Sequence, residues 1–196
     1  MSHSILHFLK ISVILLHKKK GGTSMEDPLQ SWEAQLRTYA LPEWDNLPEL
    51  ELYMDQVVLL LSRYLTFFSQ GEDEKIITPS IVNNYVRMKI MPPPNKKRYG
   101  RTHIAYLLMI CTLKQSLSIA AIQKLLPLEL DEDEVRSLYT RFVDIYRAAA
   151  THFSQIVRES QAGGQERDSL PAGMAILSCL SKSLTDYLLK YPTDTP

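Results

Sequence analysis

The sequence predicts a mainly α fold with extra C-terminal helices and one small β-wing, and three observations lead to that prediction. Apolar residues recur at spacings of three and four along most of the chain, as the buried face of a helix requires. Strand signals are almost absent. Residues 78–102 read as a capped short helix, three prolines and a basic, aromatic loop, which is the layout of a winged helix-turn-helix.

Charge is segregated along the 196 residues although the net charge is zero. Residues 1–24 carry four Lys and no acid, whereas residues 25–74 carry eleven acids and two bases. Residues 75–128 carry nine bases and no Asp or Glu, and residues 129–196 carry eleven acids and seven bases. A positive field segregated in this way suits a polyanion, or docking onto an acidic surface. The alternative is that the acidic flanks neutralise the basic span within the fold.

The first 24 residues do not fit the rest of the chain. Their apolar run is interrupted by His7 and Lys10, which makes it too short to span a bilayer. The charges follow the run instead of preceding it, the reverse of a secretory signal. Residues 20–22 can be encoded by a purine-rich ribosome-binding sequence just upstream of the Met25 codon. We therefore expect residues 1–24 to be a mis-called, disordered leader; an interfacial membrane anchor is the alternative.

Two helices and a linker are predicted before the basic span. Residues 28–39 are expected to form a weak amphipathic helix, and residues 40–48 a linker with two prolines that Trp44 pins to the core. Residues 49–69 are expected to form a stronger helix. Its core-facing stripe consists of Leu52, Tyr53, Val57, Leu60, Leu61, Tyr64, Leu65 and Phe68.

The helix predicted at residues 79–89 has the clearest start. Thr78 is a good N-cap, and Pro79 fits the first helical position because no amide donor is needed there. Three prolines at 92–94 forbid further helix, and residues 95–100 are expected to form a tight basic turn or hairpin. The inward face is predicted to be Ile81, Val82, Tyr85 and Met88, and the outward face Ser80, Asn83, Asn84, Arg87 and Lys89.

Four helices are predicted after the loop. The helix at 103–115, capped by Thr102, is nearly apolar all round and should be buried on several sides. Ser118 caps a short helix at 119–126. A long helix at 132–160 follows a capping box, and a last helix is expected at 169–190. The stripe predicted for the long helix is Val135, Leu138, Phe142, Ile145, Tyr146, Ala149, Phe153 and Ile156.

The polar residues of the basic span suit contacts with nucleic acid. A helix in the major groove must present short polar or basic side chains, because Asn pairs with adenine and Arg with guanine. Asn83, Asn84 and Arg87 share such a face, and Thr78 and Ser80 can reach phosphate from the helix start. Tyr99 can pack the loop down or contact sugar and phosphate. The predicted contacts in the loop are Lys96, Lys97, Arg98, Tyr99 and Arg101.

Residues 77–93 resemble the recognition helix of the mercury-resistance-regulator (MerR) superfamily of winged helix-turn-helix proteins. The family pattern is a Ser/Thr cap, a helix with a core Tyr, two aliphatics and Pro-Pro. The family's Arg-Tyr pair is Asn83-Asn84 here, and its Gly before the aliphatics is Lys89, so its base contacts do not carry over. The matching residues are Thr78, Tyr85, Ile90, Met91, Pro92 and Pro93, then Lys97 and Tyr99 in the shortened wing, and then Ile104, Leu107, Ile110, Leu113, Ser118, Ile119, Ile122, Leu125 and Leu126.

Residues 50–160 as a whole resemble a family of small bacterial proteins of unknown function. These proteins share the pattern ITPS…NNY…PPP…KKRY…HIAYL, which stands in this chain. Their homologues are described only as candidate DNA-binding proteins. The resemblance implies a cytoplasmic bacterial regulator and adds no known ligand.

Enzyme motifs and cofactor motifs are not found in the sequence. The five His residues are scattered, and no HExxH, GxSxG or phosphate-binding Gly loop occurs. His103 is expected to be a phosphate contact or a cap. Cys111 and Cys179 lie in apolar stretches without a CxxC pair, so we expect small buried hydrophobes. Neither a metal nor a cofactor is predicted.

The sequence thus predicts a non-enzymatic, DNA-binding transcriptional regulator. Its helix at 79–89 and its wing at 95–101 would contact double-stranded DNA, while the alternative is a protein-interaction adaptor whose basic surface docks an acidic partner. A homodimer and an unidentified small-molecule effector fit the pattern, and no membrane partner is expected. The predicted parts are the leader 1–24, an N-terminal helix and linker 25–48, a MerR-like winged helix-turn-helix 49–128, and accessory or dimerisation helices 129–196.

Overall fold

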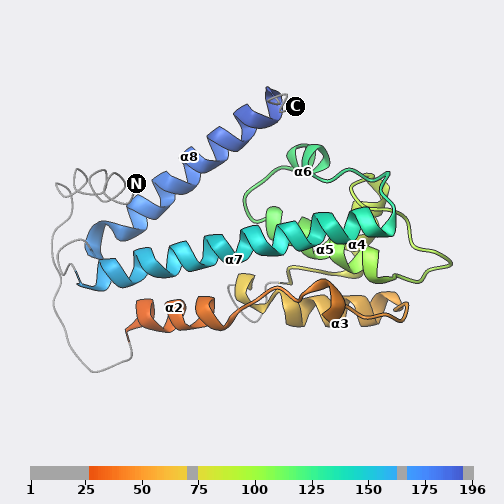
Figure 1. Cartoon of the computed structure of the whole chain (residues 1–196), viewed down its shortest axis with the longest axis horizontal. Coiled ribbons are helices and arrows are strands. Elements are labelled where there is room, and N and C mark those ends of the chain that lie inside the picture. The colour runs from red at the N-terminus through yellow and green to blue at the C-terminus, as the bar shows by residue number, and fades with distance from the viewer. Residues whose placement is uncertain (1–26, 70–74, 163–166, 192–196) are drawn as a thin grey trace. The chain divides into compact units, whose positions relative to one another are not determined.

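The computed structural model describes residues 27–69, 75–162 and 167–191 and consists of helices joined by turns and loops (Figure 1). The prediction of a mainly α fold is confirmed. The predicted β-wing is not confirmed, because the described ranges hold isolated β-bridges and no strand. The leader predicted at residues 1–24 lies outside the described residues.

The chain divides into two compact units. The central unit is Tyr39–Ala149, and the terminal unit joins the residues up to Thr38 with those from Ala150 onwards. The central unit contains η2 (Trp44–Asn46), α3 (Met54–Tyr64), η3 (Thr66–Phe68), α4 (Pro79–Arg87), α5 (Arg101–Leu113), α6 (Ile119–Leu125) and the first part of α7 (Glu132–Ala162). The terminal unit contains α2 (Pro28–Thr38), the rest of α7, η4 (Arg167–Ser169) and α8 (Leu170–Lys190).

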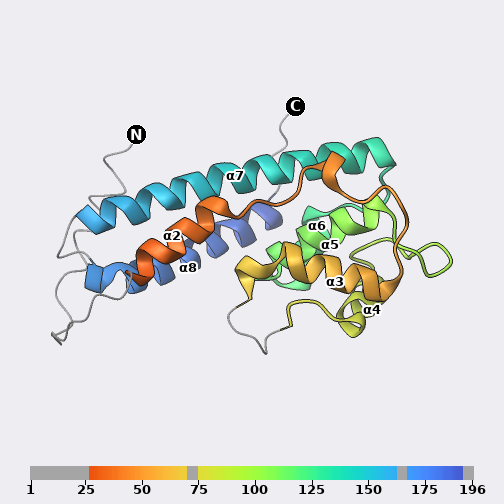
Figure 2. The same ribbon diagram turned by 90° about the horizontal axis from the view of Figure 1, so that it is seen from below.

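Helix α5 is the buried centre of the central unit. Its residues 104–111 are all buried, as expected for a helix without a polar face. It lies between α3 and α7 in both views (Figures 1 and 2). The helix begins at Arg101 and not at the predicted His103, because Gly100 is the N-cap and its N–H donates to His103 Nδ1 over 3.1 Å.

Two further predictions about the helices are corrected by the packing. Residues 49–53, predicted to be helical, precede α3, and Leu52 pairs there with Tyr99 through two backbone hydrogen bonds of 2.9 Å each. This pairing requires an extended backbone. On α7 the stripe that faces the core runs through Val135, Tyr139 and Val143, whereas Ile145 is 63% exposed. Position 145 lies on the opposite side of the helix from that stripe.

The linker before α3 packs on the core as predicted. Trp44 is buried, and its ring lies 6.2 Å from the ring of Tyr139. The Tyr139 hydroxyl donates to the carbonyl of Pro42 at 2.8 Å. Burial raises the pKa of Tyr139, so the hydroxyl remains a donor. Within the central unit, these contacts hold residues 42–44 against the first part of α7.

Helix α4 begins at the predicted cap and ends two residues early. The Thr78 hydroxyl oxygen accepts from the Ile81 N–H at 3.2 Å. After Arg87 the chain turns through Lys89 with φ 52°, and the Ile90 N–H donates to the Tyr85 carbonyl at 3.1 Å. This is the Schellman C-cap, whose left-handed residue is usually Gly.

Replacing Lys89 by Gly is therefore expected to raise the free energy of unfolding by about 1 kcal/mol, because a side chain at left-handed φ is strained. Urea denaturation followed by circular dichroism measures the change. Lys114→Gly is the control, since Lys114 has φ −66° and ψ −16° at the end of α5. Gly at that right-handed position should lower stability by roughly 0.5–1 kcal/mol. Equal effects of the two substitutions would contradict the prediction.

The terminal unit leaves much of its apolar surface exposed. Leu36 is buried on α2, and the buried Ser154 hydroxyl donates to the Glu33 carboxylate. On α8, Gly173 is the buried residue, while a row of large apolar side chains is about half exposed. That row is Ile176, Leu180, Leu184, Tyr187, Leu188 and Tyr191. Across the described ranges, no helix is both long and apolar enough to cross a membrane.

Candidate nucleic-acid interface

The outward face of α4 presents the polar residues that the sequence indicated. Ser80, Asn83 and Arg87 are exposed. The Arg87 guanidinium donates to Asn84 Oδ1 at 2.7 Å, and Asn84 Nδ2 lies 3.2 Å from Met88 Sδ. Asn84 and Arg87 are thus held together as one hydrogen-bonded pair, while Asn83 stands beside them on the same exposed surface. This surface can donate and accept hydrogen bonds at base edges.

The start of α4 is occupied by its own cap. The Thr78 hydroxyl is half-buried and accepts the Ile81 N–H, so its oxygen is already engaged. Ser80, two residues further along, is exposed. Of these two predicted phosphate contacts, Ser80 is the accessible one.

The basic loop is a two-residue hairpin turn. The Asn95 N–H donates to the Arg98 carbonyl at 3.1 Å, and the Arg98 N–H returns a bond of 2.8 Å. Lys96 and Lys97 occupy the two central positions with φ of 47° and 66°. Positive φ at both positions is the type I′ turn, where Asn-Gly is the favoured pair. The turn therefore holds two exposed lysines in a backbone conformation that disfavours them.

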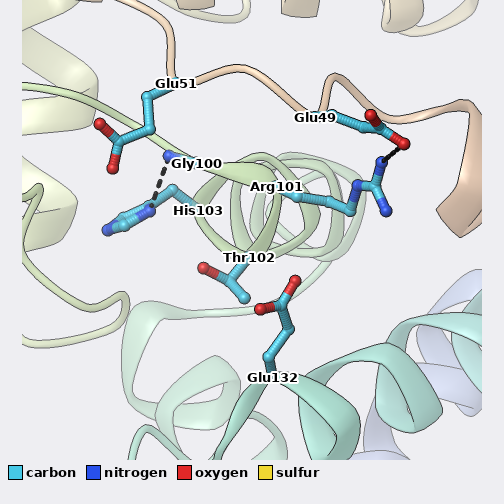
Figure 3. A pocket seen from close by; sticks show the side chains of 7 residues that line it. All are labelled: Glu49, Glu51, Gly100, Arg101, Thr102, His103 and Glu132. Carbon is cyan, nitrogen blue, oxygen red and sulfur yellow. Dashed lines mark hydrogen bonds and ion pairs between the residues drawn. The ribbon is translucent and has the colours of Figure 1, made fainter.

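His103 joins the two ends of this loop, and Figure 3 shows its contact with Gly100. Its Nδ1 accepts the Gly100 N–H at 3.1 Å, and its Nε2 lies 3.1 Å from the carbonyl oxygen of Pro93. Because a backbone N–H can only donate, Nδ1 must carry the lone pair and Nε2 the proton. Of the two roles expected for His103, the structure shows the cap.

Arg98 and Arg101 are engaged within the fold. Arg98 lies 3.9 Å from the Glu51 carboxylate, and Arg101 lies 3.4 Å from that of Glu49. The Arg101 side chain is only 17% exposed, and its guanidinium carbon lies 5.8 Å from the centre of the Trp44 ring. Both arginines therefore hold the loop against the segment before α3. Their charge is partly neutralised there.

Tyr99 packs the loop onto the core. It is 3% exposed, and its ring meets that of His103 edge-on at 5.7 Å. Its backbone pairs with Leu52, and burial raises the pKa of its hydroxyl. A side chain so covered does not reach sugar or phosphate, and we leave Tyr99 out of the contacts proposed below.

One side of the loop base is acidic. A cavity of about 370 Å³ there is lined by the carboxylates of Glu49, Glu51 and Glu132, by the Arg101 guanidinium that pairs with Glu49, and by Thr102 and His103 (Figure 3). Glu132 extends from the start of α7 toward Thr102. Glu49 and Glu51 are the partners of Arg101 and Arg98, so the negative charge on this side is partly neutralised.

Five lysines of the acid-free span form no ion pair with a carboxylate in the described parts of the chain. The two loop lysines, Lys96 and Lys97, were predicted from the sequence as contacts, and the other three were not. The acid-free composition of residues 75–128 was the signal that could have found them. The five are Lys75, Lys89, Lys96, Lys97 and Lys114.

Comparison with known proteins identifies one family. A family model described as a domain of unknown function, DUF1836, matches residues 42–148, which is more than half of the chain. The matched segment nearly coincides with the central unit, Tyr39–Ala149. No curated protein and no solved structure matches the chain significantly.

Proposed function

Since the chain belongs to the DUF1836 family, whose description names no function, we propose from its geometry that the central unit binds double-stranded DNA in a transcriptional regulator. One observation carries the proposal: three exposed lysines, Lys89, Lys96 and Lys97, are the non-glycine residues with positive φ in the described ranges. Strained backbone of this kind is concentrated at functional sites. All three belong to the acid-free span, where phosphate neutralisation is the natural use of unpaired lysines.

The proposal divides the predicted contacts into two roles. Asn83 and the Asn84–Arg87 pair would read base edges from α4, and Lys96 and Lys97 would hold phosphates. Arg98 and Arg101 become positioning residues, because carboxylates of the same unit already engage them. The turn at 95–98 then serves as a minimal wing.

The proposal includes a MerR-like winged helix-turn-helix in the central unit. Residues 65–78 connect α3 to α4. This connection is longer than the three or four residues of the usual helix-turn-helix. We therefore assign the recognition role to α4 from its exposed polar face and its following basic turn, and not from the spacing of the helices. A regulator of this kind would act in the bacterial cytoplasm.

The predicted homodimer is also part of the proposal. Helix α8 carries a row of half-exposed apolar side chains, among them Leu180, Leu184 and Tyr187. A two-fold protein doubles its footprint on a palindromic site, with half-sites spaced by the helical repeat. Analytical ultracentrifugation of the protein with and without DNA measures the oligomeric state.

Asn83→Ala is expected to reduce sequence preference without changing non-specific binding. A bidentate Asn contact discriminates against the wrong base by about 1–3 kcal/mol. Fluorescence anisotropy with the gene's own upstream DNA and a scrambled duplex should therefore show a smaller difference between the two duplexes. Ala34, on α2 in the terminal unit, gives the control Ala34→Ser at an exposed helical position; it should leave both affinities unchanged.

Wild-type binding to either duplex is the first requirement of this experiment. Counterion release most favours binding at low salt, so the measurement begins at ~50 mM salt. The absence of binding to any duplex there would reject the DNA proposal. It would favour the alternative adaptor, whose basic surface docks an acidic protein.

A further inference from the structure

A second cavity, of about 390 Å³, lies within the central unit along the side of α4 that carries Ile81, Asn84 and Tyr85. Its wall combines residues from α4, from α5 and its C-terminal end, from the start of α6, and from the segment that precedes α4. Its volume is in the range of pockets that hold small organic ligands. Of the residues proposed to contact DNA, Asn84 is the one that forms part of its wall.

The charges in this cavity have one sign. Lys75 and Lys114 line it, and both are exposed and form no ion pair with a described carboxylate. No Asp or Glu occurs among the described residues that line it, because all of these belong to the acid-free span. The cavity at the loop base differs in composition, with three carboxylates and the Arg101 guanidinium. Among the described lining residues, the two lysines are therefore the charged groups, and they can bind an anionic group.

The rest of the wall is apolar or neutral. Ile76, Ile81 and Ile119 provide aliphatic surface. The floor is formed by Tyr85 and Cys111, which are 6% and 1% exposed. Burial raises the pKa of the Cys111 thiol to about 12, so the floor carries no negative charge at neutral pH. Apolar surface beneath two cations is suited to a molecule with an apolar body and an anionic head.

We propose that this cavity binds a small amphipathic carboxylate. Its carboxylate lies between Lys75 and Lys114, and its apolar body packs against the three isoleucines. A cation would face the two lysines, and a fully apolar ligand would bury polar groups without partners.

Binding at this site changes the DNA-reading face through Asn84. Asn84 lines the cavity and also accepts the hydrogen bond from Arg87 at 2.7 Å. A ligand that bonds to the Asn84 amide competes with that contact and so alters the position of the Arg87 guanidinium. The cavity is then the effector site of the regulator. This second step rests on the proposed DNA binding, whereas carboxylate binding itself does not.

Octanoate is the probe for the first step, and octylammonium, with the same tail and the opposite charge, is its matched control. Titration of the full-length protein, followed by NMR and calorimetry without DNA, should show saturable octanoate binding and at least roughly tenfold weaker octylammonium binding. The variant Lys75→Gln/Lys114→Gln should lose octanoate affinity by roughly tenfold or more. The variant Lys182→Gln/Lys190→Gln removes two charges from α8 and should leave octanoate affinity unchanged.

Three results would overturn the carboxylate site: equal affinity for the two probes, an unchanged octanoate affinity in Lys75→Gln/Lys114→Gln, or no saturable binding up to about 10 mM. The second step is tested by anisotropy with DNA. Octanoate should change the DNA affinity of the wild type and not that of the lysine variant. If octanoate binds and the DNA affinity stays constant, the effector role is rejected while the binding site stands. If no DNA binds at all, the proposed function fails and the octanoate titration still decides the site.

Discussion

Replacing Lys96 by Asn and Lys97 by Gly is expected to stabilise the protein and to weaken its binding to DNA. Both residues sit at positive φ in a type I′ turn, where Asn-Gly is the favoured pair. A side chain in the left-handed region costs about 1–2 kcal/mol per residue, which Gly avoids and Asn reduces. We expect the double variant to gain about 1–2 kcal/mol of unfolding free energy.

The loss of DNA affinity follows from counterion release. Each phosphate contact contributes about 0.9 to the slope of log affinity against log salt, which is roughly eightfold in affinity near 0.1 M salt. Two lost contacts should lower the slope by about 1.8 and the affinity by roughly 60-fold. Anisotropy titrations between ~50 and ~200 mM salt measure the slope, and urea denaturation measures the stability.

Arg101→Gln is the matched control, because it removes a cation of the same loop that faces inward. Its side chain is 17% exposed and lies beside Glu49 and Trp44. The salt slope should stay at the wild-type value, while the unfolding free energy should fall by about 1 kcal/mol, because the guanidinium loses its contact with Trp44 and the pair with the exposed Glu49 adds little. If Arg101→Gln lowers the slope and the lysine variant does not, the division into phosphate contacts and positioning residues is wrong.

Leu107→Ala is expected to cost about 2–5 kcal/mol of unfolding free energy, because it leaves a cavity in the middle of α5. Leu107 is fully buried at 0% exposure, and its neighbours on the helix are buried as well. Packing around α5 comes from several helices, so the cavity cannot collapse by moving one side chain. Many small domains have a total stability of only 5–15 kcal/mol, which makes this loss a large fraction.

Leu184→Ala is the control for the loss of the same side chain at an exposed position. Leu184 lies on α8 and is 59% exposed, so its truncation should change the unfolding free energy by less than about 0.5 kcal/mol in the monomer. Urea denaturation at low protein concentration compares the two variants. Similar losses in both would contradict the assignment of α5 as the centre of the core.

Local signals in the chain predicted the helices well wherever a cap or an apolar pattern dominated. Thr78 caps α4 and Ser118 caps α6, as expected from their side chains. The predictions of secondary structure were wrong where a segment distant in the sequence determines the backbone conformation. Leu52 has the spacing of a helical residue, yet its N–H and C=O bond to Tyr99, and this pairing keeps its backbone extended. Periodicity within one segment contains no information about such a partner.

The exposure of several predicted contact residues followed from the sequence, but the partners of the loop arginines did not. Asn83, Arg87 and the loop lysines are exposed, as a binding surface requires. The partners of the two loop arginines lie about fifty positions upstream, in the acidic stretch 25–74, whose neutralisation of the basic span was only the alternative considered from the sequence. Charge counting along the chain treats all four loop cations alike, since it does not show which carboxylates fold against them.

The sequence by itself determined the helical class of this protein, the start of α4, the position of the basic turn and the acid-free span that surrounds it. These depend on interactions between residues a few positions apart, such as caps, prolines and helical periodicity. Only the tertiary structure decided that Arg98, Tyr99 and Arg101 hold the loop onto the core while Lys96 and Lys97 face solvent. Burial and ion pairing depend on segments that meet through folding, so two neighbouring cations of equal charge acquire different roles.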